Sequence, residues 1–174
     1  MDGITIRRVS IDDIVLLQSV SQRTFLETFA VDNTEDDMLN YLDSAFSLRK
    51  LKEELENPAS QFWFAESASQ IAGYIKVNFT PAQSDINDEK SMELERIYVY
   101  KEFLGSKVGQ ALFGKALEIA KSARSEYIWL GVWEKNPRAI RFYNKNGFVE
   151  FNRHVFRLGD DLQTDILMKM DLIH

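Results

Sequence analysis

The sequence predicts an α/β domain built on a mixed sheet of about seven strands, with helices on both faces. Short runs of β-branched and aromatic residues alternate with longer segments in which apolar residues recur at helical spacing. Helical crossovers in the second half require parallel neighbouring strands, whereas tight connections elsewhere favour antiparallel pairs. A length of 174 residues fits a single domain spanning 1–174 with a sizeable core.

Composition restricts the possible functions. Cysteine is absent, which excludes disulfides, thiolate metal sites and cysteine nucleophiles and fits a cytoplasmic location. The N-terminus lacks an apolar signal core, and no apolar run approaches the ~18 residues of a membrane span. The net charge of −6 makes nucleic acid a poor partner and favours a cationic small molecule, although acidity can also serve solubility alone.

The first half of the chain combines a strand and three helices with a hairpin. Ser10, Thr34 and Ser47 are suited to cap helix N-termini, and Asn57-Pro58 ends the third helix. The predicted elements are a strand at 4–9, helices from Ser10 to about Thr28, from Thr34, and from Ser47 to Glu56, antiparallel strands at 61–66 and 71–79, and a mobile loop at 81–91.

The next strand, 92–100, has an irregular apolar pattern. Met92 and Leu94 share one parity, whereas Ile97 and Val99 share the other. An extra residue near Glu95-Arg96, a β-bulge, restores a single buried face. The alternative is a strand buried on both faces, for which parity carries no information.

A turn and a helix follow this strand directly and together form a candidate anion site. The turn at 101–107 contains Gly105, and Gly109 lies at the start of the helix. Unpaired N–H groups and the helix dipole favour a phosphate there. The remaining predicted elements are a helix from Val108 to about Lys121, a strand at 127–133, a helix capped by Asn136 and ended at Asn146-Gly147, and strands at 148–158 and 164–172.

The stretch Leu94–Ala120, followed by N-P-R-A at 136–139 and F-Y-x-x-x-G-F at 142–148, resembles the GCN5-related N-acetyltransferase superfamily. The resemblance covers nearly the whole chain. It implies transfer of acetyl from acetyl-CoA to a primary amine by direct attack in a ternary complex, without a metal. The N-terminal third, with T-F-L-E-T-F and Y-L-D-S-A-F, is similar more narrowly to bacterial spermidine/spermine-type acetyltransferases, which implies a polyamine or another small amine.

The resemblance also implies a set of residues that hold the cofactor. The strand backbone binds the pantetheine arm, the turn binds the pyrophosphate, and cations reach the nucleotide. The expected residues are Ile97, Tyr98, Val99, Gly105, Ser106, Lys107, Val108, Gly109, Gln110, Asn136, Arg138 and Lys145. The turn departs from the family pattern, since Leu104 replaces a polar residue and Lys107 replaces a glycine. Backbone N–H groups do most of the phosphate binding, so these changes need not abolish it.

Acetyl transfer to an amine needs a proton acceptor and a group that protonates the departing thiolate. The family position of Tyr143 implies the acid. Glu95, at the predicted bulge, is expected to be the base or to order a water chain, with Glu93 as the fallback.

The acceptor site is expected between the first helices and the strand of Glu95, with Phe25, Glu27 and Phe29 in contact with the substrate. Further carboxylates for a polyamine are available at Glu35 and Asp36. His154 and His174 form no metal-site or triad pattern. A second function remains open, that of an acetyl-CoA-binding regulatory module without turnover. The oligomeric state is also open, either a monomer or a homodimer.

Overall fold

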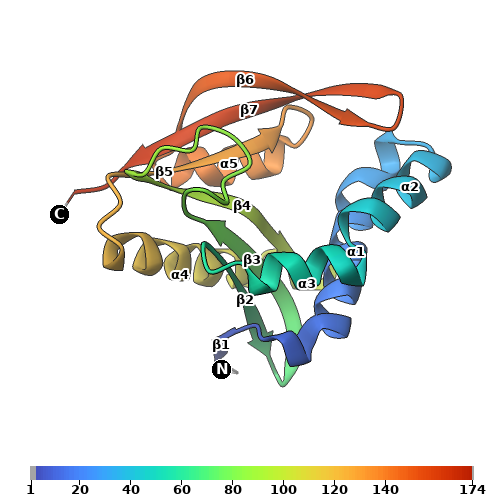
Figure 1. Cartoon of the computed structure of the whole chain (residues 1–174), viewed down its shortest axis with the longest axis horizontal. Helices are drawn as coiled ribbons and strands as arrows, with labels where there is room; N and C mark the ends of the chain where they lie inside the picture. The colour runs from blue at the N-terminus through green and yellow to red at the C-terminus, as the bar shows by residue number, and fades with distance from the viewer. Residues whose placement is uncertain (1–2, 174) are drawn as a thin grey trace.

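The computed structural model describes residues 3–173, so His174 lies outside the described residues. One seven-stranded mixed sheet has the order β1-β2-β3-β4-β5-β7-β6, which confirms the predicted fold class (Figure 1). The elements are β1 (Ile4–Arg8), α1 (Ile14–Phe29), α2 (Glu35–Ala45), α3 (Leu48–Glu56), β2 (Ser60–Ser67), β3 (Gln70–Asn78), β4 (Ser91–Val99), α4 (Val108–Ser122), β5 (Tyr127–Trp133), α5 (Pro137–Lys145), β6 (Val149–Leu158) and β7 (Asp161–Asp171).

The predicted helix starts are confirmed, with small differences at two boundaries. The side chains of Thr34, Ser47 and Asn136 each accept a hydrogen bond from a backbone N–H in the first turn of their helices. The segment after Ser10 begins as a 3-10 turn before α1. Strand β7 starts earlier than predicted, at Asp161, because the turn at Gly159 is tight enough to pair Asp161 with Leu158.

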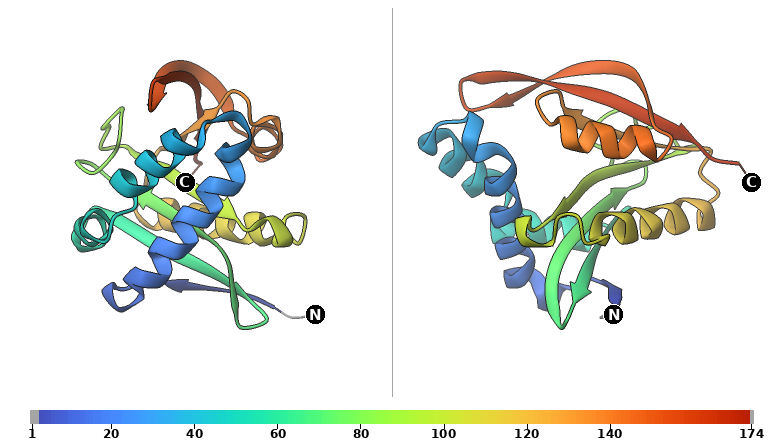
Figure 2. Two further views of the ribbon diagram at one scale, coloured as in Figure 1. Left: turned by 90° about the vertical axis from the view of Figure 1, so that its right-hand side faces the viewer. Right: turned by 180° about the vertical axis from the view of Figure 1, so that it is seen from behind.

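Two apolar cores lie on opposite faces of the sheet. Helices α4 and α5 cover one face, where Leu112 and Phe148 are fully buried. Helices α1, α2 and α3 cover the other face, where Leu17 and Leu51 are fully buried. Figure 2 shows α1–α3 grouped together, away from α4 and α5. No helix within residues 3–173 is long and apolar enough to cross a membrane.

Strands β4 and β5 separate after a short paired section. Their parallel pairing covers only Ser91–Glu93 against Tyr127–Trp129. Beyond it, β4 pairs only with β3 and β5 only with β7, so the facing edges of both strands lack partners (Figure 1). This split is the feature of the fold that creates room for ligands, since unpaired strand edges offer N–H and C=O groups.

The predicted β-bulge in β4 is confirmed. Arg96 pairs with Lys76 and Leu94 pairs with Val77, which leaves Glu95 as the extra residue. The bulge explains the parity change along the strand, because one inserted residue moves the following side chains to the opposite face. It also places Glu95 at the start of the split between β4 and β5.

Candidate active site

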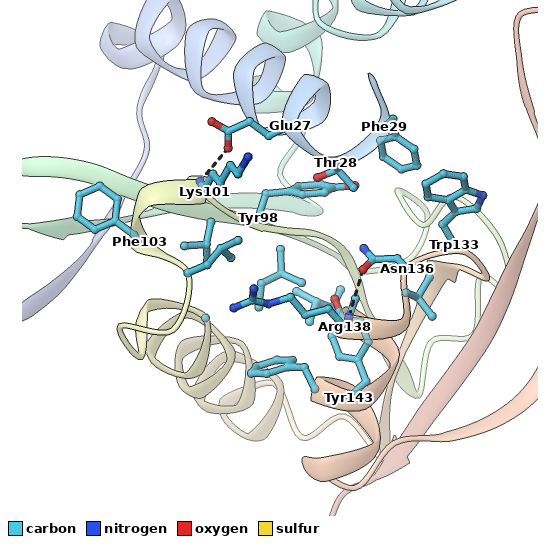
Figure 3. Close-up of a pocket in the computed structure, with 18 of the residues that line it drawn as sticks. Glu27, Thr28, Phe29, Tyr98, Lys101, Phe103, Trp133, Asn136, Arg138 and Tyr143 are labelled. Carbon is cyan, nitrogen blue, oxygen red and sulfur yellow. Dashed lines mark hydrogen bonds between the residues drawn. The ribbon is translucent and has the colours of Figure 1, made fainter. Parts of the chain in front are cut away.

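A cavity of about 700 Å³ occupies the split between β4 and β5; we call it the first cavity. Its walls are β4, the turn before α4, the first turn of α4, the C-terminal end of β5 and α5. Figure 3 shows the Arg138 side chain extending from α5 into the middle of this cavity. The volume falls within the usual range of ~300–1,000 Å³ for ligand sites.

The turn before α4 presents backbone N–H groups to the first cavity. Helix α4 begins at Val108, so its first N–H groups have no partner within the helix. Gly105 and Lys107 both have positive φ angles, +84° and +69°. A left-handed residue is unfavourable for any side chain, which explains why a glycine is expected at position 107. The turn therefore keeps the geometry of an anion cradle although its sequence departs from the pattern.

The first cavity has an excess of basic side chains over its three carboxylates, Glu27, Asp32 and Glu95, in a chain whose net charge is −6. Five basic side chains line it: Lys101, Lys107, Lys135, Arg138 and Lys145. None of them forms an ion pair with a described residue, that is, with any residue from 3 to 173. Unpaired cations around helix N–H groups are suited to an anion with several phosphates.

Most residues that we expected to hold the cofactor meet in this cavity. Those that line it are Ile97, Tyr98, Val99, Gly105, Lys107, Gly109, Gln110, Asn136, Arg138 and Lys145. The side chains of two others do not: Val108 is buried in the core below α4, and the Ser106 hydroxyl donates to the carbonyl of Phe103. These two can contribute only backbone groups. A Cβ on Gly109 would meet Phe142 and Val99 at 3.9 Å, so the protein alone leaves room for it.

Tyr143 lines the first cavity from α5 and is 7% exposed. Its hydroxyl forms no hydrogen bond within the described chain, so it is available to a ligand. Burial raises the pKa of Tyr143 well above its usual value. The phenol is therefore protonated at neutral pH and can only donate a proton there.

A second cavity, of about 500 Å³, opens on the other side of the split, between the sheet and helices α1 and α2. Its lining is aromatic and charged: Phe25, Phe29, Tyr41, Phe46, Ser84, Asp85, Glu93, Glu95, Arg96, Tyr98, Trp129, Gly131, Trp133, His154, Val155, Phe156, Arg157, Asp165 and Leu167. Five of these residues also line the first cavity, namely Phe29, Glu95, Tyr98, Gly131 and Trp133. The two cavities therefore meet at the split between β4 and β5.

Glu95 lies at this meeting point, within a buried ion-pair network. Its Oε2 atom is 2.8 Å from Nζ of Lys76 and 3.3 Å from Nε of Arg96. Glu54 of α3 completes the network, at 3.1 Å from Lys76 and 3.3 Å from Arg96. Burial alone would raise the pKa of Glu95, but Arg96 and Lys76 lower it below its ordinary value. Glu95 is thus a fixed anion with weak basicity.

Glu93, the fallback base, also has hydrogen-bond partners within the protein. It is 2% exposed, and its carboxylate accepts hydrogen bonds from Nδ2 of Asn78 and from the backbone N–H and hydroxyl of Ser84. Burial raises the pKa of Glu93, and the charge of Glu95 adds to the effect. Its hydrogen bonds tie the loop at 81–91 to β4.

The residues expected to contact the acceptor divide between two roles. Phe25 and Phe29 line the second cavity, and Phe25 stacks on Tyr41 with ring centroids 4.5 Å apart. Glu27 instead accepts a hydrogen bond from the backbone N–H of Lys101 at 2.8 Å, which fixes the end of β4 (Figure 3). Glu35 and Asp36 lie in the first turn of α2 and line neither cavity.

Several residues of the second cavity escaped the sequence reasoning. Trp133, Gly131 and Asp165 are on strands that were predicted, but the sequence did not show that β7 pairs with β5 and so brings Asp165 opposite Trp133. A signal did exist for Asp165, a carboxylate directly before the apolar run Ile166-Leu167-Met168. Charges are rarely placed on a buried strand without a partner or a function.

Comparison with known proteins agrees with this geometry. The profile of the acetyltransferase (GNAT) family matches residues 21–148. An uncharacterized N-acetyltransferase of Lactobacillus delbrueckii subsp. lactis is 39% identical over 173 residues, 99% of this chain and 100% of the relative. A spermidine N(1)-acetyltransferase of Thermoplasma acidophilum is 28% identical over 84% of this chain and 88% of its own length. The crystal structure of the PaiA N-acetyltransferase of T. acidophilum with coenzyme A superposes with a TM-score of 0.80 at 25% identity, covering 98% of this chain and 99% of that one.

Proposed function

The chain belongs to the acetyltransferase (GNAT) family and uses acetyl-CoA to acetylate an amine; from this premise we propose that its acceptor is a polyamine or another small primary amine. The observation that carries the proposal is the meeting of the two cavities at the split in the sheet. One cavity has an excess of basic side chains and suits the cofactor, whereas the other is aromatic and contains four carboxylates beside Arg96 and Arg157. An amine that enters the second cavity can therefore attack a thioester in the first directly.

The first cavity fits acetyl-CoA as co-substrate. The unpaired edge of β4 at Ile97–Val99 is suited to hydrogen-bond the pantetheine amides, and Asn136 has an amide nitrogen free to add a bond. The turn at 105–110 and the unpaired lysines suit the phosphates. When bound there, acetyl-CoA supplies an activated acyl carbon and a thiolate leaving group.

Two side chains divide the remaining chemistry in this proposal. Tyr143 donates its proton to the thiolate as the carbon–sulfur bond breaks, because its phenol is neutral and unpartnered. Glu95 orders water at the split and stabilises positive charge on the incoming nitrogen. We favour the water-ordering role over that of direct base, since Lys76 and Arg96 depress the pKa of its carboxylate.

The second cavity supplies recognition of a cation. Phe25, Phe29 and Trp133 line it, and a ring face left open by their mutual packing stabilises an ammonium group by about 0.5–2 kcal/mol. Carboxylates at its rim and floor add electrostatic attraction. The spermidine acceptor in the name of the T. acidophilum relative supports the polyamine class for this chain.

The test is release of free coenzyme A from acetyl-CoA with a panel of amines: spermidine, spermine, lysine, an aminoglycoside and a peptide with a free N-terminus. We expect turnover with the polyamines and a loss of about 100-fold in kcat for Tyr143→Phe, with unchanged acetyl-CoA affinity. Tyr127→Phe is the matched control, because the Tyr127 hydroxyl binds Asp88 away from both cavities. Preferred turnover of a peptide or an antibiotic would refute the polyamine assignment, and full activity in Tyr143→Phe would refute the acid.

A further inference from the structure

We propose that Asp165 is a further catalytic residue, whose carboxylate receives the acceptor nitrogen beside Gly131 and takes the proton that this nitrogen loses. The inference rests on the proposed acetylation of an amine. It concerns the proton acceptor, for which Glu95 and Glu93 are both poorly placed chemically, since each is engaged in an internal network.

The position of Asp165 follows from strand pairing. On β7 it lies opposite Trp133 of β5 and His154 of β6, so its side chain shares the face that carries α1 and α2. A Cβ placed on Gly131 would lie 3.4 Å from Oδ2 of Asp165. Gly131 lines both cavities, and a side chain there would crowd this carboxylate and Leu167, whose Cδ2 atom also lies 3.4 Å from the Cβ position. Asp165 therefore lies where an amine in the second cavity meets the first.

The other three carboxylates that line the second cavity all have partners within the protein. Glu93 accepts hydrogen bonds from Asn78 and Ser84, and Glu95 pairs with Lys76 and Arg96. Asp85 accepts a hydrogen bond from the backbone N–H of Ile86 and contacts the imidazole of His154. Within residues 3–173, Asp165 alone of these four has neither a hydrogen bond nor an ion pair. Its oxygens are free to bind a donor from the substrate.

The surroundings give this carboxylate a suitable basicity. Burial raises the pKa of Asp165 to about 6, although His154 opposes the effect. The other charged groups that line the same cavity are Asp85 on the loop, Glu93, Glu95 and Arg96 on β4, and Arg157 on β6. A base that titrates near the working pH combines a useful fraction of the ionised form with real proton affinity.

The proton balance of the step is complete. The ionised carboxylate attracts the ammonium group of the acceptor, which first loses one proton to solvent, because only the neutral amine is a nucleophile. As the nitrogen attacks the acyl carbon, the new carbon–nitrogen bond makes that nitrogen strongly acidic, and its proton passes to Oδ2 of Asp165. The carbon–sulfur bond then breaks, and Tyr143 protonates the thiolate. These transfers leave an amide, a free thiol, a protonated Asp165 and an ionised Tyr143. Asp165 then releases its proton to solvent and Tyr143 takes one up from solvent, which restores both residues.

The experiment measures kcat and KM for spermidine from pH 5 to 9 in wild type, Asp165→Asn and the matched control Asp171→Asn, an exposed carboxylate at the end of the same strand. We expect Asp165→Asn to lose about 100-fold in kcat/KM, mainly through kcat, and to lose the step near pH 6. Asp171→Asn keeps both. Asp165→Ser, a smaller polar replacement, gives the same test if the asparagine variant fails to fold, and acetyl-CoA affinity reports on the fold of each.

Three other outcomes would overturn the inference about Asp165. Activity of Asp165→Asn within about threefold of wild type would overturn the inference while leaving the proposed function intact. A rise in KM alone with an unchanged pH profile would reduce Asp165 to a binding residue and would also overturn it. If wild type turned over no amine of the panel, the proposed acceptor class would fail, and the inference with it.

Discussion

Substitution of Lys76 by methionine should destabilise the protein strongly, because Lys76 is the central cation of the buried network at the bulge. Its ammonium group lies 3.1 Å from Glu54 and 2.8 Å from Glu95, and the residue is only 5% exposed. Removing one partner of a buried ion pair typically costs about 3–5 kcal/mol, since the remaining charge stays desolvated. Arg96 still faces both carboxylates, so we expect the low end, about 3 kcal/mol, or a drop of about 6–12 °C in Tm.

The stability lost in Lys76→Met should depend on pH. The pKa of Glu95 is lowered in the folded state, so its ionised form stabilises the fold above the ordinary glutamate pKa of 4.5 and this contribution is lost as the pH falls. Lys76→Met removes part of that lowering. The difference between variant and wild type should therefore be full at pH 7 and shrink below about pH 4.5.

Urea unfolding followed by circular dichroism, at pH 7 and below about pH 4.5, measures this difference in unfolding free energy. Arg49→Met is the control, because the Arg49–Glu53 pair is exposed and such pairs contribute about 0–1 kcal/mol. The double variant Lys76→Met/Glu95→Gln should recover part of the lost stability. A cost below about 1 kcal/mol for Lys76→Met, or one independent of pH, would contradict the argument from the buried network.

Two further predictions concern single residues. Lys107→Gly should raise Tm by about 2–4 °C, because glycine adopts the left-handed conformation at φ +69° without strain. The same change should weaken acetyl-CoA binding several-fold, because the site loses a cation. An unchanged Tm in thermal unfolding would refute backbone strain at position 107. Asp165→Asn should stabilise the fold by about 1–3 kcal/mol at pH 8 and by little at pH 4, because the pKa of Asp165 is raised from 3.8 to about 6 and the folded state disfavours its ionised form at high pH. Equal unfolding free energies of variant and wild type at pH 8 would contradict the desolvation of this half-buried carboxylate.

Local pattern predicted most of the fold. The helix caps at Thr34, Ser47 and Asn136 were readable because capping chemistry depends on a few adjacent residues. The bulge at Glu95 was readable because a change of parity along one strand has few causes. Each of these features is fixed within a single element.

The missed features depend on register between elements far apart in the chain. The network around Glu95 requires Glu54 from α3 and Lys76 from β3. The pairing of β3 with β4 brings Lys76 to Arg96, and α3 adds Glu54. Asp165 meets Gly131 through the pairing of β7 with β5. A sequence shows that each residue is charged, but not which charge neutralises which, and that difference decides which carboxylate remains free for chemistry.

A crystal structure with coenzyme A and spermidine bound together would test whether an amine in the second cavity attacks acetyl-CoA in the first across the split sheet. We expect the pantetheine arm between β4 and β5, the thiol near the Tyr143 hydroxyl, and an amine nitrogen in hydrogen-bond contact with Asp165. Spermidine bound outside the second cavity, or a pantetheine arm outside the split, would contradict this arrangement.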